Sequence, residues 1–323
     1  MTGTARKAIA GIPVPERRAL LPPTQTLPQR VWANAYLLLT LTMLMWAGNA
    51  IASRLSVGNI SPMTMTTLRW GCVCLVLPLL LRRELAEHAP VLRQRWRFIA
   101  LMGICGFTMF NLLLYLAGYS TTAINIGILQ GSIPIFVLIG AFLVYRTPIA
   151  PLQALGVAVT MLGIAVTASR GDIHILAGLR FAIGDIYMIV ASMLYAGYTV
   201  AIRNRPPMPA LVFFAAAGFA AFVGSLPLLA IEIATGHTYW PTVTGWLILI
   251  FVVIGPSMIA QLTFLRAVEL IGPGRAGVFA NLVPVFAPIM AVFILGEQLA
   301  LYHGLALALV LGGIFIAERL GRR

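Results

Sequence analysis

Charged side chains are scarce in this sequence, and acidic ones are the scarcest. Of the 323 residues, 10% are charged and 60% are hydrophobic, and Asp and Glu together number only 9. Soluble globular domains carry about 25% charged residues, so this chain has too few ionic groups to cover a surface that faces water. The composition excludes a soluble domain and predicts a polytopic membrane protein.

Cysteines and the motifs of catalytic sites are also few. Cys72, Cys74 and Cys105 lie inside apolar runs, and an odd number of intramembrane thiols does not build a disulfide framework. The single residue between Cys72 and Cys74 is not a zinc-ligand spacing. The glycine-rich stretch 272–277 lacks the lysine of a phosphate loop. The sequence therefore predicts no enzyme, no metal site and no cofactor.

Positive charge is present, and it lies beside the apolar runs. The net charge of +13 would suggest nucleic acid in a soluble protein. Here the basic residues flank hydrophobic segments, where they orient helices in a bilayer, so nucleic acid is not an expected partner. Residues 1–30 hold several basic residues and prolines but no apolar run, which predicts a disordered basic cytoplasmic tail.

Ten apolar segments follow the tail, each near the ~20 residues that cross a bilayer as an α-helix. They are 31–56, 60–81, 96–117, 120–145, 149–169, 179–203, 208–232, 244–267, 272–296 and 298–318. With the N-terminus in the cytoplasm, most Lys and Arg residues fall on the cytoplasmic side of the membrane. The sequence thus predicts an all-α membrane protein with both termini cytoplasmic.

The second half of the chain repeats the first. The stretch WAGN at 46–49 aligns with YAGY at 195–198, 149 positions later. The repeat divides the chain into 31–169 and 170–323, with five predicted helices in each part. Because five is odd, the second copy crosses the membrane upside down. Inverted five-helix repeats around a central cavity are typical of transporters.

These features together resemble the EamA-type branch of the drug/metabolite transporter superfamily. The resemblance rests on the ten segments, the repeat, Trp46-x-x-Asn49, the paired Pro134 and Pro284, and the ending LGEQLALYHGLALALVLGGIFI at 295–316. Within that branch the chain is most similar to bacterial aromatic amino-acid exporters of the YddG type. The resemblance implies an exporter in the bacterial inner (plasma) membrane.

Polar and aromatic side chains near mid-span are the candidates for lining the cavity, because intramembrane polar groups usually face the interior of a bundle. They are Trp46, Asn49, Asn111, Tyr115, Gln130, Tyr195, Tyr198, Ser257, Gln261, Phe264 and Asn281. The amides of Asn111 and Gln261 occupy equivalent positions and suit the ammonium and carboxylate of a zwitterion. The alternative is that such residues only hydrogen-bond or pack between helices.

Two prolines and two glycines are candidate hinges or gates. They are Pro134, Pro284, Gly127 and Gly277. A proline inside a helix removes a backbone donor, kinks the helix and frees a carbonyl about four residues earlier. Such backbone is tolerated in a membrane where it is buried or lines a cavity. The alternative is a static packing kink.

Charged residues are expected mostly at the ends of the segments. No carboxylate falls at mid-depth, and Glu297, which aligns with Thr147, belongs to a turn. Proton relays usually need intramembrane acids or histidines, so we expect an uncoupled facilitator. Arg54 and Arg203 are expected to reach the interface as anchors. The deeper Arg69 is expected to pair with a carboxylate or a carbonyl.

Together these observations predict a secondary transporter that exports small organic solutes by alternating access around an aromatic and amide-lined cavity. The expected solutes are amino acids with aromatic or other apolar side chains. The alternative is efflux of planar cationic drugs or other metabolites, because aromatic walls also accept cations. The expected partners are the solute and the lipid bilayer, and a monomer is compatible with the sequence.

Overall fold

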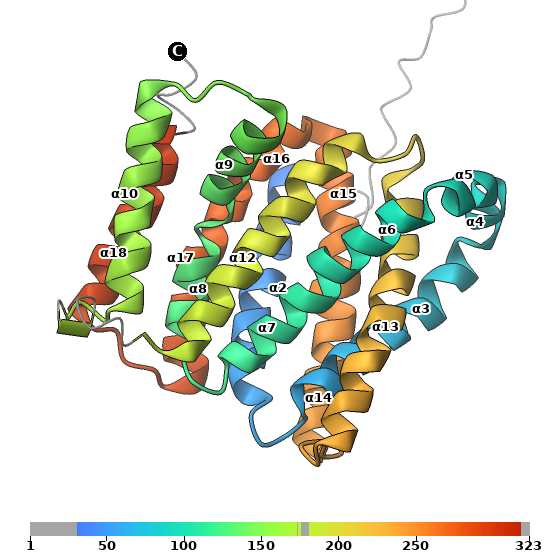
Figure 1. The fold of residues 1–323 in the computed structure, drawn as a ribbon, viewed down its shortest axis with the longest axis horizontal. Helices are drawn as coiled ribbons and strands as arrows, with labels where there is room; N and C mark the ends of the chain where they lie inside the picture. The colour runs from blue at the N-terminus through green and yellow to red at the C-terminus, as the bar shows by residue number, and fades with distance from the viewer. Residues whose placement is uncertain (1–30, 173, 176–180, 318–323) are drawn as a thin grey trace, which may run out of the picture.

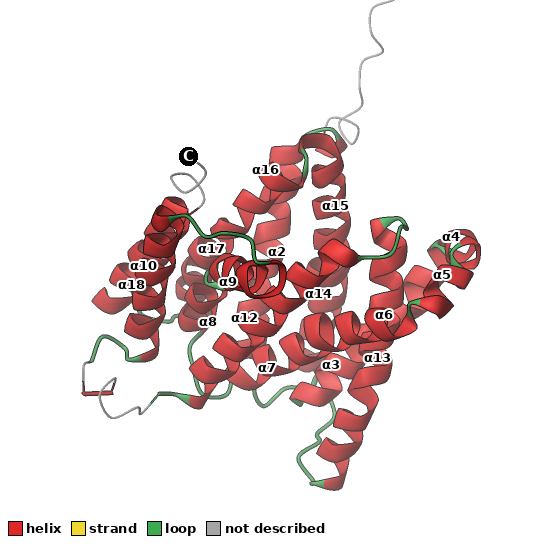
Figure 2. Ribbon diagram, turned by 45° about the horizontal axis from the view of Figure 1, so that its top comes forward, coloured by secondary structure: helices red, strands yellow, loops and turns green. Residues whose placement is uncertain are grey.

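The computed structural model describes residues 31–172, 174–175 and 181–317, and the regular elements in these ranges are helices (Figure 2). The predicted tail at 1–30 and the last residues, 318–323, lie outside the described residues. Within the described part, 9 helices are long and apolar enough to cross a membrane, and a tenth, α18 (Leu301–Phe315), is shorter. The all-α polytopic fold is confirmed.

The first half of the chain forms five spans, and two of them are interrupted. The continuous spans are α2 (Ala35–Leu55), α3 (Pro62–Leu80) and α10 (Pro151–Ala168). The third span consists of α6 (Trp96–Gly103), η1 (Ile104–Met109) and α7 (Phe110–Ala117), and the fourth of α8 (Ala123–Gln130) and α9 (Ile133–Tyr145). Two short helices, α4 (Arg82–Glu87) and α5 (Ala89–Gln94), connect α3 to α6.

The second half repeats this order, including the interruptions. Its first two spans are α12 (Ile183–Ala201), which ends in the turn η2 (Ile202–Asn204), and α13 (Ala210–Ala234). The third consists of α14 (Val243–Val252), η3 (Val253–Ile259) and α15 (Ala260–Ile271). The fourth consists of α16 (Pro273–Val278), η4 (Phe279–Leu282), α17 (Val283–Met290) and η5 (Ala291–Leu295), and α18 follows it.

The interruptions fall at equivalent positions of the two repeats. η1 and η3 are π-helical turns, and η3 contains Pro256, which has no N–H to donate. In the fourth spans, Pro134 and Pro284 occupy the first turn of α9 and of α17, where a missing N–H costs nothing. The sequence predicts kinks inside continuous helices; instead, each proline begins a new helix after a break in the span.

The last span begins later than the predicted segment 298–318. Gly296 has a φ of 68°, a left-handed conformation that glycine adopts at little cost because it has no Cβ. This residue ends the preceding span, and residues 296–300 are not helical. The regular helix α18 therefore begins only at Leu301.

Helix packing mixes the two repeats. α2 packs on α15 and α17, and its repeat equivalent α12 packs on α7 and α9. These contacts define two groups: the α2 bundle (α2, η3–α15 and α16–η4–α17) and the α12 bundle (α12, η1–α7 and α8–α9). Each bundle takes one span from one repeat and two from the other. α3 pairs with α13 at one flank, and α10 pairs with α18 at the opposite flank (Figure 1).

Candidate functional site

A cavity lies between the two bundles and α3, at the level of the interrupted spans. It holds about 910 Å³ of empty space, counting its mouth. All four interruptions contribute to its wall, through Phe107 of η1, Ser257 of η3, Gly131 of the α8–α9 break and Asn281 of η4. Irregular backbone at membrane depth is tolerated where it lines a cavity, and π-turns recur at functional sites.

Most of the predicted cavity residues line this cavity. They are Trp46, Asn49, Asn111, Gln130, Tyr195, Ser257, Gln261 and Asn281, together with the candidate hinge Pro134. Two of these amides have an unused atom, because Gln130 Nε2 and Asn281 Oδ1 are buried without a hydrogen-bond partner among the described residues. Buried polar atoms are normally satisfied, so these two amides, whose residues line the cavity, each keep one polar atom that no internal hydrogen bond occupies.

Three predicted cavity residues lie behind the wall instead. They are Tyr115, Tyr198 and Phe264, none of which lines the cavity. Tyr115 is fully buried and points its hydroxyl at Arg69, while Tyr198 and Phe264 pack their rings on lining aromatics, 5.5 Å from Tyr195 and 5.4 Å from Trp46. Each follows a lining residue by three or four positions. That spacing rotates a side chain by about 40–60° around the helix, which moves it from the wall into a helix interface.

The candidate hinge glycines differ between the repeats. Gly127 of α8 faces α17 so closely that a Cβ on this glycine would collide with the Cβ of Ala287. Around its repeat equivalent Gly277, in α16, no neighbouring atom lies within 4 Å of a Cβ placed there. The two bundles therefore touch at Gly127, whereas the exposed Gly277 has open space beside it. Pro284, the remaining hinge candidate, is not part of the cavity wall.

Arg69 of α3 is the most extensively hydrogen-bonded side chain of the cavity, and it is not among the predicted cavity residues. It is only 5% exposed and lines the cavity. Its Nε donates to Ser257 Oγ at 2.7 Å. Its Nη1 lies 2.7 Å from Asn111 Oδ1, 2.6 Å from Tyr115 Oη and 3.1 Å from Asn49 Oδ1. These partners come from both bundles, so Arg69 lies where the bundles and α3 meet.

Of the partners expected for Arg69, side-chain carbonyl oxygens are present, on Asn49 and Asn111, and a carboxylate is absent from these contacts. All four partners are neutral side chains, and no acidic residue of the described chain lines the cavity. Nη2 of Arg69 donates to no described residue, yet it is not among the polar atoms buried without a partner. Nη2 is therefore accessible, and the accessible space that Arg69 lines is the cavity. Because burying an unpaired cation is costly, ionisable residues inside membranes usually mark functional positions.

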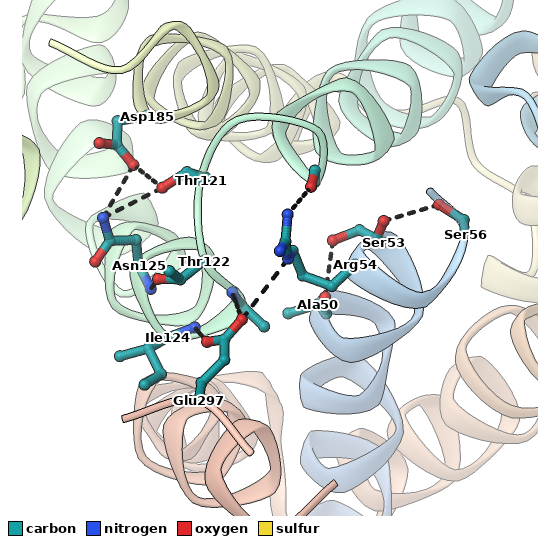
Figure 3. Close-up of polar contacts among 12 residues, drawn as sticks. Ala50, Ser53, Arg54, Ser56, Thr121, Thr122, Ile124, Asn125, Asp185 and Glu297 are labelled. Carbon is teal, nitrogen blue, oxygen red and sulfur yellow. Dashed lines mark hydrogen bonds and ion pairs between the residues drawn. The ribbon is translucent and has the colours of Figure 1, made fainter. Parts of the chain in front are cut away.

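The two bundles are joined where α2 ends and α8 begins, through the polar contacts drawn in Figure 3. Arg54 at the end of α2 lies 3.7 Å from Glu297, measured from Nε to Oε1, and its Nη1 donates to the carbonyl of Gly118 after α7. Glu297 accepts hydrogen bonds from the backbone N–H groups of Ala123 at 2.9 Å and Ile124 at 3.0 Å, which begin α8. A helix N-terminus stabilises a carboxylate in this way. Arg54 at the end of its span is thus an ion-pair partner, and its expected role as an interface anchor stays a prediction.

We call this region the closed end. Asp185 adds a contact within the α12 bundle there, because it is fully buried at the start of α12 and accepts hydrogen bonds from Thr121 Oγ1 and, at 3.2 Å, from Asn125 Nδ2 (Figure 3). Both donors lie at the beginning of α8. The closed end therefore holds α8 to α12 through Asp185 and to Glu297, the residue that also pairs with Arg54 of α2.

The repeat equivalent of Arg54 behaves differently at the opposite end. The guanidinium of Arg203 lies 4.9 Å from the centre of the Tyr145 ring, which is a cation–π contact, and its expected role as an interface anchor stays a prediction. Both residues belong to the α12 bundle. Thr147 stands where the other end has Glu297, so the acid that joins the bundles has no counterpart here.

Comparison with known proteins identifies the family. A model of the EamA-like transporter family matches residues 33–169 and again residues 182–318. The chain belongs to the EamA-like transporter family. An "uncharacterized transporter" of Archaeoglobus fulgidus is 24% identical over 88% of this chain and 97% of the relative. The "uncharacterized transporter YetK" of Bacillus subtilis is 24% identical over 88% and 86% of the two chains.

The double match places one EamA-like unit in each half of the chain, which confirms the expected family and the two-repeat membrane fold. A solved crystal structure with 21% sequence identity covers 90% of this EamA-like chain and 98% of its own, with a TM-score of 0.60. That similarity shows a shared fold. The protein is an integral membrane transporter.

Proposed function

We propose that this EamA-like protein exports small organic solutes, and in particular amino acids with aromatic or other apolar side chains, by alternating access. The observation that carries the proposal is the mid-membrane cavity, whose wall is built from the interrupted spans of both repeats. Such a cavity, largely apolar with a few convergent polar groups, is the usual form of a small-molecule site.

The wall suits a solute that is apolar at one end and zwitterionic at the other. Trp46 comes from the α2 bundle, while Phe110 and Tyr195, with ring centres 5.0 Å apart, come from the α12 bundle. These rings offer flat apolar surfaces. Gln130 and Asn281 also line the cavity, and a rotation of each side chain would bring its unpartnered amide atom to a solute, as a donor for a carboxylate and an acceptor for an ammonium group.

The contrast between the two ends supports alternating access. The bundles are joined at the closed end and have open space around Gly277. With the N-terminus in the cytoplasm, the closed end faces outward and this conformation faces the cytoplasm. Exchanging the roles of the inverted repeats would separate the bundles at Gly127 and bring them together at Gly277. Pro134 and Pro284, each at the start of a half-helix, are the proposed hinges.

The proposal is tested by uptake into liposomes that contain only this protein. The panel consists of amino acids, planar organic cations and sugars, with protein-free liposomes as the control. We expect amino acids with aromatic or apolar side chains to enter faster than in the control. Movement of a planar cation with no amino acid moving would contradict the proposal and favour drug efflux.

We further propose that transport is not coupled to protons. Among the described residues, the cavity wall contains no Asp, Glu or His, and proton relays in membrane proteins are built from such side chains. A protonophore added at a constant solute gradient is expected to leave the uptake rate unchanged. Collapse of uptake under these conditions would show coupling by another route.

A further inference from the structure

The cavity contains a positive charge that no described residue balances. Arg69 is held only by neutral groups, and its Nη2 faces the cavity without a hydrogen-bond partner among the described residues. We propose that Arg69 forms an anion-binding subsite that takes the carboxylate of the transported solute. This inference rests on the proposed transport function and names the chemical group that the cavity selects.

The guanidinium is oriented before a solute arrives. Nε is fixed by Ser257, and Nη1 is fixed by Asn111, Tyr115 and Asn49, at distances of 2.6–3.1 Å. Because the guanidinium is planar, these contacts also fix the two N–H bonds of Nη2. Little conformational freedom is then lost when an anion binds, which favours affinity.

The buried and half-buried carboxylates of the described chain are engaged elsewhere, near the starts of helices, although Asp185 keeps one oxygen without a partner. Glu297 and Asp185 bind the beginning of α8 at the closed end. Glu232 accepts hydrogen bonds from Ser61 Oγ at 2.8 Å and from the backbone N–H of Met63 at 3.0 Å, where α3 begins. A carboxylate that neutralises Arg69 must therefore come from outside these groups, and a solute that enters the cavity can bring it.

The same charge discriminates between solutes. A cationic solute would meet Arg69 without an acid to offset the repulsion, whereas a carboxylate gains a charge-assisted hydrogen bond from Nη2. The subsite thus favours amino acids and organic acids over planar cations. Its partners come from both bundles, so a carboxylate bound there lies at the point where the bundles meet α3.

The test compares acids with their primary amides, which keep the side chain and the ammonium group but lose the negative charge. L-Phenylalanine, L-tryptophan and L-leucine are each titrated against the corresponding amide, using the full-length purified protein and the shift of its unfolding temperature. We expect each amide to need at least about tenfold more ligand for half-saturation, as for loss of a charge-assisted hydrogen bond. Equal half-saturation by acid and amide would overturn the subsite and leave transport untouched.

Two variants localise the effect. Arg69→Gln is expected to bring the acid-to-amide ratio close to one, while Arg266→Gln is expected to preserve it, because Arg266 pairs with Glu269 at 2.9 Å outside the cavity wall. An unchanged ratio in folded Arg69→Gln would overturn the assignment. If Arg69→Gln fails to fold, Arg69→Lys serves as the second variant. It keeps the positive charge, so we expect it to keep the preference for acids over amides. Loss of that preference in Arg69→Lys would also contradict the subsite. If no acid or amide binds and no amino acid enters liposomes, the proposed function itself fails.

Discussion

Arg54 and Arg69 carry the same charge in the same membrane-spanning chain, but they have different partners. Arg54, at the closed end, has the carboxylate of Glu297 at 3.7 Å. Arg69, in the cavity, has only hydroxyl and amide partners, at 2.6–3.1 Å. Because Arg54 pairs with the carboxylate of Glu297, it belongs to the contact between the bundles. The missing carboxylate leaves the second with a charge that a solute can balance.

The contrast extends to the surroundings of the two arginines. At the closed end, Glu297 binds both Arg54 and the N-terminus of α8. In the cavity wall, Gln130 Nε2 and Asn281 Oδ1 have no partner among the described residues, and at the closed end Asp185 Oδ2 and Asn125 Oδ1 also lack one. The difference lies in the arginines, because Arg54 has a carboxylate partner whereas Arg69 lines the cavity without one. We therefore assign conformational closure to the first region and solute binding to the second.

Removing the charge of Arg69 is expected to have the largest effect on transport. Arg69→Gln should lower uptake of labelled L-phenylalanine into liposomes by about 10–100-fold, because a hydrogen bond to a charged group contributes about 1.5–3 kcal/mol. Arg54→Gln is the matched variant at the closed end, and we expect it to keep the preference for acids over amides. Wild-type uptake by folded Arg69→Gln would erase the distinction between the two arginines.

Adding a methyl group at the closed end is expected to have the next largest effect. Gly127→Ala would press on Ala287 and cost about 1–3 kcal/mol of closure. Gly277→Ala, which meets no neighbour within 4 Å, is the control. The readout is thiol labelling of Ser53→Cys, a fully buried position at the closed end, with Cys72, Cys74 and Cys105 replaced by alanine. Labelling should be faster with Gly127→Ala only, and equal rates in both variants would refute closure at Gly127.

Variants of Asn281 and Asn111 are expected to distinguish a residue that contacts the solute from one that holds Arg69 in place. Asn281→Ala removes an unpartnered acceptor and is expected to reduce uptake several-fold, as for loss of about 0.5–1.5 kcal/mol, with no change in unfolding temperature. Asn111→Ala should also lower that temperature, because Asn111 accepts from Arg69 and donates to the Phe107 carbonyl at 2.7 Å. The measurements are initial uptake rates and unfolding temperatures. If both variants changed the uptake rate and the unfolding temperature equally, Asn281 and Asn111 would not have different roles.

Neutralising Glu297 is expected to have the smallest effect. Glu297→Gln keeps an oxygen for the N-terminus of α8 but loses the charge, worth about 0.3–1 kcal/mol at a helix end. We expect a modest rise in the labelling rate of Ser53→Cys. Glu269→Gln, which breaks the exposed pair with Arg266, should leave the rate unchanged. A rise of the same size in both variants would mean that Glu297 has no special part in closure.

The fold was accessible from the sequence because a bilayer permits few structures. An apolar run of about 20 residues must be a helix there, and aligned pairs such as Pro134 and Pro284 reveal the repeat. The interruptions were harder to predict. Pro256 is a local signal for η3, but its equivalent η1 contains no proline. Interactions with neighbouring helices decide such backbone irregularities, and a single sequence does not show them.

The sequence predicted which residue types line the cavity, but not which side chains point into it. Asn111 and Tyr115 are four positions apart, yet the first lines the cavity and the second lies behind it. That difference depends on how far the helix is rotated, which interhelical packing sets. Arg69 does carry a signal, because it is deeper in its segment than Arg54 or Arg203. The neutrality of its partners, which come from spans far apart in the sequence, becomes visible only once the helices are assembled.

The central claim is that Arg69 binds the carboxylate of the solute. A cryo-EM structure of the full-length protein with L-phenylalanine in the cavity tests it most directly. We expect a carboxylate oxygen of the amino acid about 2.7–2.9 Å from Nη2 of Arg69, the usual length of a charge-assisted N–H···O hydrogen bond. An amino acid bound with its carboxylate turned away from Arg69 would contradict the claim.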